Sequence, residues 1–533
     1  MRAVRSYLTN QSSVNEHGGP TPYDEVRYPC YSHTLSHPDV LAKQALLYGL
    51  KTAPVDSCRV LELGCGDGSN LIPMAFGLPH GHFTGIDLAG EPVARGNELI
   101  AALGLGNVTL VHADVLDFDP ATGEFDFIIA HGLFSWVPQP VQEKILAICS
   151  THLAPLGVAF ISYLAQPGSY ARTMLRDMML FHTRECDGLD ASVAAAKDLA
   201  GLIASVPPAN DLVQFLLQSE ARRVLEMVPG HLYHDDLAEW SSAFYLMQFA
   251  AAAGHHGLQF LAEADFADMQ DRHLPPEVRA KLHVLAPDRV LREQYLDFSR
   301  GRRFRQTLLC RSGLPICGEP DPACLEQLFC SCAAETDHLP IDLSPDIDVT
   351  FRGPRATTLE SRYAPGKAAL AVLIAAWPRR LAFAELLAAA RAQLAAAGYP
   401  AEVATAVALQ AFLLDLHGAG MVDLHAHPTL QCLAPGARPQ ASPVALWQVA
   451  RGHFASSLRH VGYTFNNDPA IHLFRLLDGR RNRNEITRAL LDNPEARAAL
   501  LENGLPDAAQ FAALRQVVDK EIDHFARLGM LVG

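Results

Sequence analysis

The sequence predicts an α/β protein built on a doubly wound parallel sheet, with a helical insertion and mainly helical C-terminal modules. Three observations lead to this fold class. Short apolar runs alternate with helical patterns between Arg59 and Tyr163. Apolar residues then recur at three- and four-residue steps between Pro167 and Gly254, and helices followed by one short apolar run repeat near the end of the chain. Strands that alternate with helices are typical of parallel sheets, and the three- and four-residue steps are typical of helices.

The predicted strands place several polar residues at one edge of the sheet. The first strand, RVLEL, leads into the glycine-rich turn GCGDG, which opens a helix at Gly64 to Gly68. The strand HFTGIDL carries Asp87 at its end, NVTLVHAD ends in Asp114, and FDFIIA is followed by His131. Ligands of such sheets bind beyond the carboxyl ends of the strands. We therefore expect the glycine turn, both acids and the histidine to surround one site.

The residues near the turn indicate what kind of ligand binds. The turn contains no lysine or arginine, so it offers no charge to a phosphate. Glu62 precedes it, and Asp87, roughly twenty residues further on, can hold ribose hydroxyls. Asp114 can accept a hydrogen bond from an exocyclic adenine amine. This pattern favours a nucleoside that carries a cation over a pyrophosphate.

The motifs LELGCGDG, GIDL, HAD and FDFIIAHG, in this order, resemble those of class I S-adenosylmethionine-dependent methyltransferases. The resemblance implies that S-adenosyl-L-methionine is the cofactor. It also implies that Gly64 and Gly66 let the backbone approach the methionine part, while Asp87 and Asp114 hold ribose and adenine. Cys65 lies in the turn and is expected to contribute backbone rather than a nucleophile. The expected cofactor-binding residues are Glu62, Gly64, Cys65, Gly66, Gly68, Asn70, Asp87, Leu88, Asp114, Val115 and His131.

Class I sheets have two further strands, which we place at residues 256–266 and 304–311. The methyltransferase domain then spans 28–312, after an N-terminal arm at 1–27. Its helical insertion, about 168–255, is expected to cover the catalytic edge as a lid or substrate platform. The insertion suits packing or a dimer surface equally well, so a homodimer is also considered.

The C-terminal part is predicted to hold two winged-helix-like modules, at 341–432 and 441–533, after a linker at 313–340. Each module ends with a helix, a glycine and a short strand. Winged helices can bind DNA, but the chain from residue 341 onward is nearly neutral, with 19 basic and 18 acidic residues. The clustered basic residues are Arg480, Arg481 and Arg483. Three clustered arginines offer little positive charge for binding nucleic acid, so we expect a protein-contact or structural role instead.

The whole chain resembles a bacterial group that joins a methyltransferase domain to a methyltransferase regulatory region and a winged-helix part. The local resemblances are YDEVRYP, SHPDVLA, AHGLFSWVP, MLRDMML and FRQTLLC. The group includes lysine methyltransferases that act on outer-membrane proteins, which implies a protein as methyl acceptor. One loop departs from the group, because Leu164 and Ser169 stand where Asn and Trp are usual. That loop is expected to face the substrate, with Tyr170 taking over the aromatic role or with a different acceptor.

His131 and Trp136, in the stretch AHGLFSW, are the candidate catalytic residues. Their strand should lie beside the first strand, where its end meets the reactive end of the cofactor. His131 is expected to take a proton from the acceptor or to hydrogen-bond the cofactor, and Trp136 and Phe134 to wall an acceptor channel. Acidic and aromatic walls suit an ammonium group, which predicts in-line N-methylation of a protein lysine. Alternatively, His131 caps the strand and Trp136 packs under the next helix.

Composition bounds the remaining possibilities. The chain has 533 residues and a net charge of −15, which disfavours polyanions and suits cationic ligands. Eleven cysteines without framework spacing, and no targeting segment, favour the cytoplasm. The longest apolar run, 368–377, is too short to insert into a membrane. No metal is expected, because five crowded cysteines lack ligand spacing: Cys310, Cys317, Cys324, Cys330 and Cys332.

Three other functions stay open. A buried slot admits a small-molecule acceptor as readily as a lysine. The substituted loop at Leu164 and Ser169 suits a scaffold that binds the cofactor without catalysis. A winged-helix DNA regulator would depend on the three clustered arginines.

Overall fold

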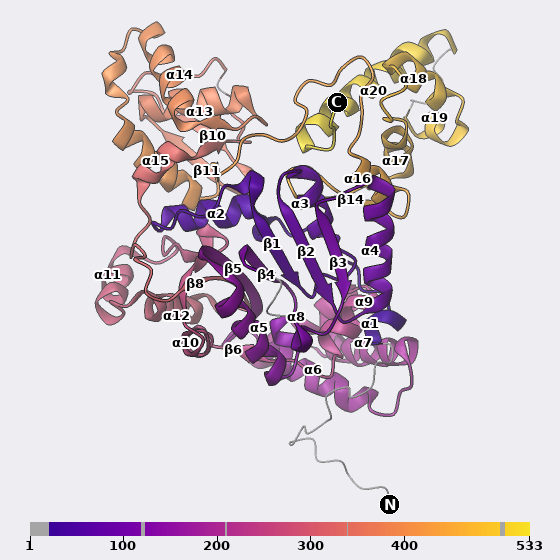
Figure 1. Cartoon of the computed structure of the whole chain (residues 1–533). Helices are drawn as coiled ribbons and strands as arrows, with labels where there is room; N and C mark the ends of the chain where they lie inside the picture. Colours follow the sequence, from indigo (N-terminus) through magenta and orange to yellow (C-terminus); the bar gives the residue numbers. More distant parts are fainter. Residues whose placement is uncertain (1–20, 119–122, 208–210, 338, 501–506) are drawn as a thin grey trace, which may run out of the picture.

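The computed structural model describes residues 21–118, 123–207, 211–337, 339–500 and 507–533, so residues 1–20 of the expected N-terminal arm lie outside the described residues. A sheet with strand order β3-β2-β1-β4-β5-β8-β7 forms its centre, and β6 pairs with the end of β5 (Figure 1). Strands β1 to β5 are parallel, whereas β8 is antiparallel to both β5 and β7. The predicted fold class is confirmed. The strands are β1 Arg59–Leu63, β2 His82–Asp87, β3 Val108–His112, β4 Phe125–Ala130, β5 Leu153–Ala165, β6 Ala243–Phe244, β7 Leu258–Glu263 and β8 Phe304–Arg311.

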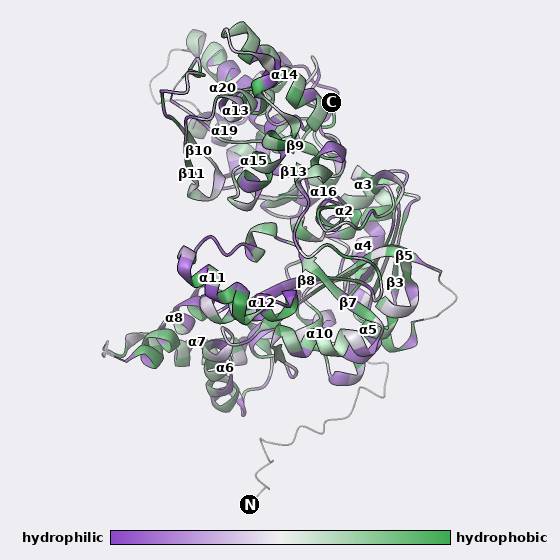
Figure 2. Ribbon diagram, turned by 90° about the vertical axis from the view of Figure 1, so that its left-hand side faces the viewer, coloured by the Kyte–Doolittle hydropathy of each residue, from purple (hydrophilic) through white to green (hydrophobic). Residues whose placement is uncertain are grey.

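Helices cover both faces of this sheet. Successive side chains of a strand point to opposite faces, so Val60 joins one core and Leu61 the other. The first core contains helices α2, α3 and α4, and the second contains α5 and α10. Figure 2 shows the resulting arrangement, with largely hydrophobic strands at the centre of the domain. The helices are α2 Pro38–Leu47, α3 Leu71–Gly77, α4 Gly90–Leu103, α5 Gln139–His152, α10 Leu246–His255, α11 Pro276–Leu285 and α12 Arg289–Arg300.

The chain between β5 and β6 forms a helical subdomain with a small core of its own. Leu175, Val193, Ala221 and Leu232 belong to that core. The subdomain lies at one end of the sheet, and the C-terminal modules lie at the other end (Figure 1). Its last turn is a π-helix, a geometry that is rare and frequent at functional sites. The elements are α6 Tyr170–Thr183, α7 Leu189–Ser205, α8 Leu212–Glu226, α9 Pro229–His231 and the π-helix η6 Leu232–Asp236.

The first C-terminal module is built on the antiparallel sheet β12-β9-β13, and a hairpin β10-β11 precedes its helices. Strand β9 lies inside the range expected as a linker. The core of this module is continuous with the α2 face of the central sheet, since one buried cluster contains Leu41, Ala45, Leu325 and Leu413. The elements are β9 Phe329–Ser331, β10 Val349–Arg352, β11 Thr358–Ser361, α13 Ala364–Ala376, β12 Leu381–Ala382, α14 Phe383–Ala396, α15 Ala406–Gly418 and β13 Asp423–His425.

A buried carboxylate fastens α2 to this module. Asp39 accepts hydrogen bonds from the backbone N–H groups of Ala426 at 2.7 Å and His427 at 2.8 Å. Its carboxylate also pairs with Arg380 at 3.1 Å. Burial opposes ionisation, but Arg380 and His425 hold the pKa of Asp39 below its ordinary value. Asp39 is therefore a charged bridge between the two domains.

The second C-terminal module has a separate core that includes Phe465, Phe474, Ile522 and Phe525. The short strand expected at its end is reduced to a single bridge between Ala441 and Leu531. Among the residues that the structure describes, no helix is long and apolar enough to cross a membrane. The elements are α16 Pro443–Val449, β14 Phe454–Ser456, β15 Gly462–Thr464, α17 Asp468–Arg475, α18 Arg483–Leu491, α19 Pro494–Leu500 and α20 Asp507–Leu528.

Candidate active site

A cavity of about 1540 Å³ lies at the carboxyl ends of β1, β2 and β4. Three parts of the chain enclose it: these strand ends, the N-terminal segment 21–33, and the segment 231–240 that contains the π-helix. The volume exceeds that of a typical small-ligand pocket, so a nucleoside and part of a second molecule fit together. Of the residues expected to bind the cofactor or to be catalytic, only Gly68 does not line it. Those that do are Glu62, Gly64, Cys65, Gly66, Asn70, Asp87, Leu88, Asp114, Val115, His131 and Trp136.

The glycine turn is held against the end of β2. The backbone N–H groups of Gly64 and Cys65 donate to the carbonyl of Ile86 at 2.9 and 3.1 Å. Gly64 and Gly66 have φ angles of +74° and +55°, which residues with a side chain rarely adopt. Gly68 also has a positive φ angle, +71°, but it lies away from the cavity, and a Cβ there would lie 2.8 Å from the side chain of Leu110. The first two glycines thus bring bare backbone to the cavity wall.

Asp87 ends β2 and joins the turn to the next helix. Its Oδ2 accepts the N–H of Gly66 at 2.7 Å, and its Oδ1 accepts the N–H of Ala89 at 2.8 Å. Burial raises the pKa of the carboxyl group in spite of these two bonds. Each carboxylate oxygen has a second lone pair, so Asp87 can still accept hydroxyl groups from the cavity.

Asp114 and two apolar residues form the adjacent wall. Asp114 Oδ1 accepts the N–H of Leu116 at 2.8 Å and begins a short 3₁₀ turn. Val115 is buried, whereas Leu88 is exposed, and both line the cavity. A carboxyl group beside two apolar side chains suits a flat heterocycle that carries an amine.

Glu62 is buried beneath the glycine turn. Its Oε1 accepts a hydrogen bond from Asn70 Nδ2 at 2.7 Å. Within the described residues, its buried Oε2 has no hydrogen-bond partner. Burial raises the pKa of Glu62 to about 8, although the Asn70 bond acts in the opposite direction. A buried oxygen without a partner is unfavourable, so Glu62 is suited to a donor that enters the cavity.

His131 follows β4 and faces His33 of the N-terminal segment, with ring centroids 3.7 Å apart. Its Nδ1 is buried and has no hydrogen-bond partner among the described residues. Burial, and next the neighbouring His33, lower the pKa of His131 to about 3. At neutral pH the imidazole is therefore uncharged and a poor proton acceptor, but it can hydrogen-bond a ligand.

Trp136 also reaches the cavity, but Phe134 does not. The indole N–H of Trp136 donates to the carbonyl of Asp235 at 3.1 Å, which orients the ring. Phe134 is fully packed against Phe249, with centroids 5.4 Å apart. The expectation that Phe134 walls an acceptor channel is therefore wrong, because the short 3₁₀ turn at 134–136 points it into the core.

The substituted loop also differs from expectation. Leu164 is buried in β5, and its N–H donates to Ser135 Oγ at 2.8 Å. Ser169 is buried too, and its hydroxyl donates to the carbonyl groups of Ala165 and Arg303. Neither residue lines the cavity, nor does Tyr170, whose hydroxyl contacts that of Tyr245. The departures therefore concern packing beside the site rather than its wall.

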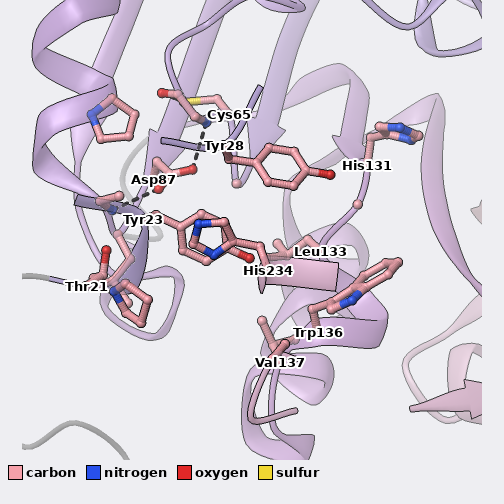
Figure 3. A pocket seen from close by; sticks show the side chains of 18 of the residues that line it. Thr21, Tyr23, Tyr28, Cys65, Asp87, His131, Leu133, Trp136, Val137 and His234 are labelled. Carbon is pink, nitrogen blue, oxygen red and sulfur yellow. Dashed lines mark hydrogen bonds between the residues drawn. The ribbon is translucent and has the colours of Figure 1, made fainter. Parts of the chain in front are cut away.

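The N-terminal segment and the π-helix supply aromatic residues that sequence reasoning missed. Tyr23 stacks on His234 with centroids 4.0 Å apart and planes inclined by 11°. Figure 3 shows this pair lying between Asp87 and Leu133. Tyr28 donates its hydroxyl to Asp235 Oδ1 at 3.3 Å. Both tyrosines occur in the sequence YDEVRYP. Two aromatic residues in an otherwise polar N-terminal arm were the sequence feature that could have indicated their role in the site.

The lysine, arginine, aspartate and glutamate side chains that line the cavity are all acidic. None of the described residues that line it is lysine or arginine. Burial raises the pKa of Asp235 to about 6, so it is largely ionised at neutral pH. Cationic groups are favoured in such surroundings. The lining carboxyl groups are those of Glu62, Asp87, Asp114, Asp117, Asp235 and Glu239.

Family models match three parts of the chain. They are a "Methyltransferase domain" at residues 60–157, a "Predicted methyltransferase regulatory domain" at 229–311, and a "PKMT, C-terminal winged helix domain" at 437–529. The chain is 32% identical over 237 residues to "Uncharacterized protein RP028" of Rickettsia prowazekii, which covers 43% of this chain and 93% of that protein. The chain belongs to the class I S-adenosylmethionine-dependent methyltransferases that carry a methyltransferase regulatory domain.

Two further similarities extend over more of the chain. "Uncharacterized protein RP789" of Rickettsia prowazekii is 36% identical over 317 residues, which are 59% of this chain but only 57% of that protein. The solved structure of PKMT2 from Rickettsia typhi superposes with a TM-score of 0.85 at 25% identity, and covers 95% of this chain and 100% of PKMT2. PKMT2 has also been solved in complex with AdoHcy, with the same TM-score.

The regulatory-domain match places the aromatic residues in context. It begins at residue 229, so it includes the π-helix as well as β7 and β8. In this methyltransferase the regulatory region therefore both completes the sheet and lines the cavity. The crowded cysteines lie elsewhere: Cys310, Cys330 and Cys332 are buried, and the described residues contain no group placed to hold a metal ion.

Proposed function

We propose that this chain transfers the methyl group of S-adenosyl-L-methionine to an amine, and that the amine belongs to a protein lysine. The observation that carries the proposal is a cavity lined by acidic side chains and by no lysine or arginine among the described residues. Within it, Glu62 has a buried oxygen beneath the glycine turn that lacks a hydrogen-bond partner in the described part of the chain. The resemblance to lysine methyltransferases and the match to PKMT2 support the choice of acceptor.

The residues present fit this cofactor. We propose that Gly64, Cys65 and Gly66 receive its methionine part and that Glu62 accepts the methionine ammonium. Asp87 is suited to ribose hydroxyls, because both of its oxygens are already aimed by backbone N–H groups. Asp114 is suited to the adenine amine, with Leu88 and Val115 against the ring. The cofactor supplies an activated methyl group on a sulfonium, which an amine can displace in line.

The remaining wall is suited to a lysine side chain. Trp136 and Tyr28 offer aromatic faces, and Asp235 offers a carboxylate that attracts an ammonium group. The acceptor must lose its proton before it reacts, which is unfavourable at pH 7 for an amine with a pKa of about 10.4. Partial burial among aromatic rings lowers that pKa. His131 is uncharged, so we propose that it hydrogen-bonds and orients the reactants rather than acting as the base.

The test uses the full chain with S-adenosylmethionine that carries a labelled methyl group. Lysate proteins are the acceptor pool, and mass spectrometry identifies the labelled residue. Asp87→Ala serves as a control that should lose labelling. Label on lysine supports the proposal, whereas label on carboxyl or hydroxyl groups only would contradict the acceptor assignment.

A small-molecule acceptor is the second candidate, favoured by the volume of about 1540 Å³. Label that appears only in the low-molecular-weight fraction would select it. Cofactor binding without any transfer would instead select the scaffold function. The homodimer, the cytoplasmic location and the role of the winged-helix modules in substrate contact stay predictions.

A further inference from the structure

A histidine of the C-terminal winged-helix domain is buried beside the methyltransferase domain. His460 lies between β14 and β15, and only 2% of its surface is exposed. Its Nε2 lies 2.8 Å from Oδ1 of Asn70, which is 390 positions earlier in the chain. Its φ angle is +57°, a left-handed conformation that a histidine adopts at a cost in energy. Close contact and an unfavourable backbone together indicate that this position is held for a purpose.

The hydrogen bonds of Asn70 settle the direction of this contact. Asn70 Oδ1 accepts the backbone N–H of His33 at 2.9 Å, and Nδ2 donates to Glu62 Oε1 at 2.7 Å. The backbone N–H of His33 cannot accept a hydrogen bond, so its partner must be the amide oxygen, and the amide of Asn70 has one orientation. His460 must therefore donate Nε2–H to Asn70 Oδ1. Burial, together with His37 and His33, lowers the pKa of His460 well below its ordinary value, so the ring is neutral with its proton on Nε2.

The same amide controls Glu62. Its second N–H donates to Ser36 Oγ at 3.1 Å, so both of its protons and its oxygen are engaged. With Oε1 of Glu62 held by this fixed amide, Oε2 is the oxygen that has no hydrogen-bond partner among the described residues, and Glu62 lines the cavity. The chain of contacts thus runs from the winged-helix domain to the cofactor site in two hydrogen bonds.

We propose that His460 is a positioning residue for the cofactor, which fixes Asn70 so that Glu62 presents its free oxygen to the methionine ammonium. The inference rests on the proposed function. It gives the winged-helix domain a role in assembling the active site, which does not require DNA. The domain also holds the N-terminal segment, because Tyr31 packs edge-on against Phe454 with centroids 4.8 Å apart.

Paired variants distinguish the effect of the imidazole hydrogen bond on cofactor binding from the effect of holding the winged-helix domain in place. His460→Asn keeps a residue that tolerates φ above zero but lacks a donor at the Nε2 position. His460→Gln restores an N–H at that reach. Thr34→Val removes a different bond to the same residue, from Thr34 Oγ1 to the carbonyl of His460 at 2.7 Å. Isothermal titration calorimetry with S-adenosylmethionine at pH 7 measures Kd for each full-length variant.

We expect His460→Asn to raise Kd about five- to tenfold, the size expected for one buried hydrogen bond, while Thr34→Val stays within about twofold. His460→Gln should recover most of the affinity. In an Asn70→Ala background, His460→Asn should have no further effect, because its partner is gone.

Three results would overturn the inference: unchanged Kd in His460→Asn with a lower melting temperature, an equal loss in Thr34→Val, or additive losses with Asn70→Ala. Each would show that His460 only docks the domain. If His460→Asn does not fold, His460→Met, which is also unable to donate, takes its place beside His460→Gln. A wild-type chain that binds no S-adenosylmethionine would instead refute the proposed function itself.

Discussion

Cofactor affinity should rise steeply with pH because of Glu62. Its pKa is raised to about 8, so the neutral acid predominates at pH 7 and only about one molecule in eleven carries the carboxylate. A cationic ammonium group binds the ionised form. The apparent Kd equals the intrinsic Kd divided by the competent fraction, so it should fall about tenfold between pH 6 and pH 7. That factor corresponds to about 1.4 kcal/mol.

The sign can be checked independently through the proton itself. A group whose pKa is raised must lose a proton to hold a cation, so binding at pH 7 should release roughly 0.9 proton per cofactor. Calorimetry in two buffers with different ionisation enthalpies measures this release. Glu62→Gln is the matched control, because it keeps the size and the contact with Asn70 but cannot ionise. It should bind weakly, with no proton release and a flat profile from pH 6 to pH 7.

A flat profile in the wild-type chain, or equal slopes in wild type and Glu62→Gln, would refute this reasoning. The methionine α-amino group itself titrates at a pKa of about 8, so the comparison stays at pH 7 and below, where that group remains a cation. Within this range only the enzyme side of the pair changes its charge with the predicted slope.

Four other substitutions test the remaining walls of the cavity. Asp87→Ala and Gly64→Val should each weaken cofactor binding about a hundredfold or more, as measured by titration. The first removes charged acceptors, and the second places a side chain at φ +74° against Leu133. Unchanged affinity in both variants would exclude the site. His131→Ala should lower kcat about tenfold with little change in the Kd of the cofactor. A plot of the wild-type kcat against pH should show no inflection near pH 6.5, because the pKa of His131 is lowered to about 3. An inflection at pH 6.5 that disappears in the variant would show that His131 is the base. Trp136→Ala should raise the acceptor KM about fivefold through a lost cation–π contact, a change that steady-state kinetics would detect and that an unaltered KM would contradict.

The part of the site that follows β-strands could be predicted from the sequence. Gly64, Asp87 and Asp114 occur at strand ends, and the rule that parallel strands end at a common edge brings such residues together. Asn70 could be anticipated as well, because it lies two residues beyond Gly68, the last glycine of the turn. These positions depend on local patterns, and the pattern contains enough information to place them.

The other half of the site depends on tertiary contacts that no local pattern encodes. Tyr23 and His234 are more than two hundred residues apart, and each appears in the sequence as a polar segment with an aromatic residue. His460 lies still further away, in a domain whose obvious interpretation was DNA binding. The prediction for Phe134 was wrong for the opposite reason, because it assigned a function to a residue that only packs. An aromatic residue beside a predicted active site suggests a function, but the structure buries Phe134 in the core.

The continuous core that α2 shares with the first C-terminal module has a consequence for how this protein unfolds. Because Leu41 and Leu413 belong to one buried cluster, the two regions cannot be separated without exposing apolar surface on both. The charged bridge at Asp39 would lose its partners in the same event. Cooperative units follow packing rather than the order of motifs along the chain, so the catalytic sheet and its neighbouring module melt together. The methyltransferase is in this sense one folding unit with its appendage, and a chain cut between them would leave an open face on α2.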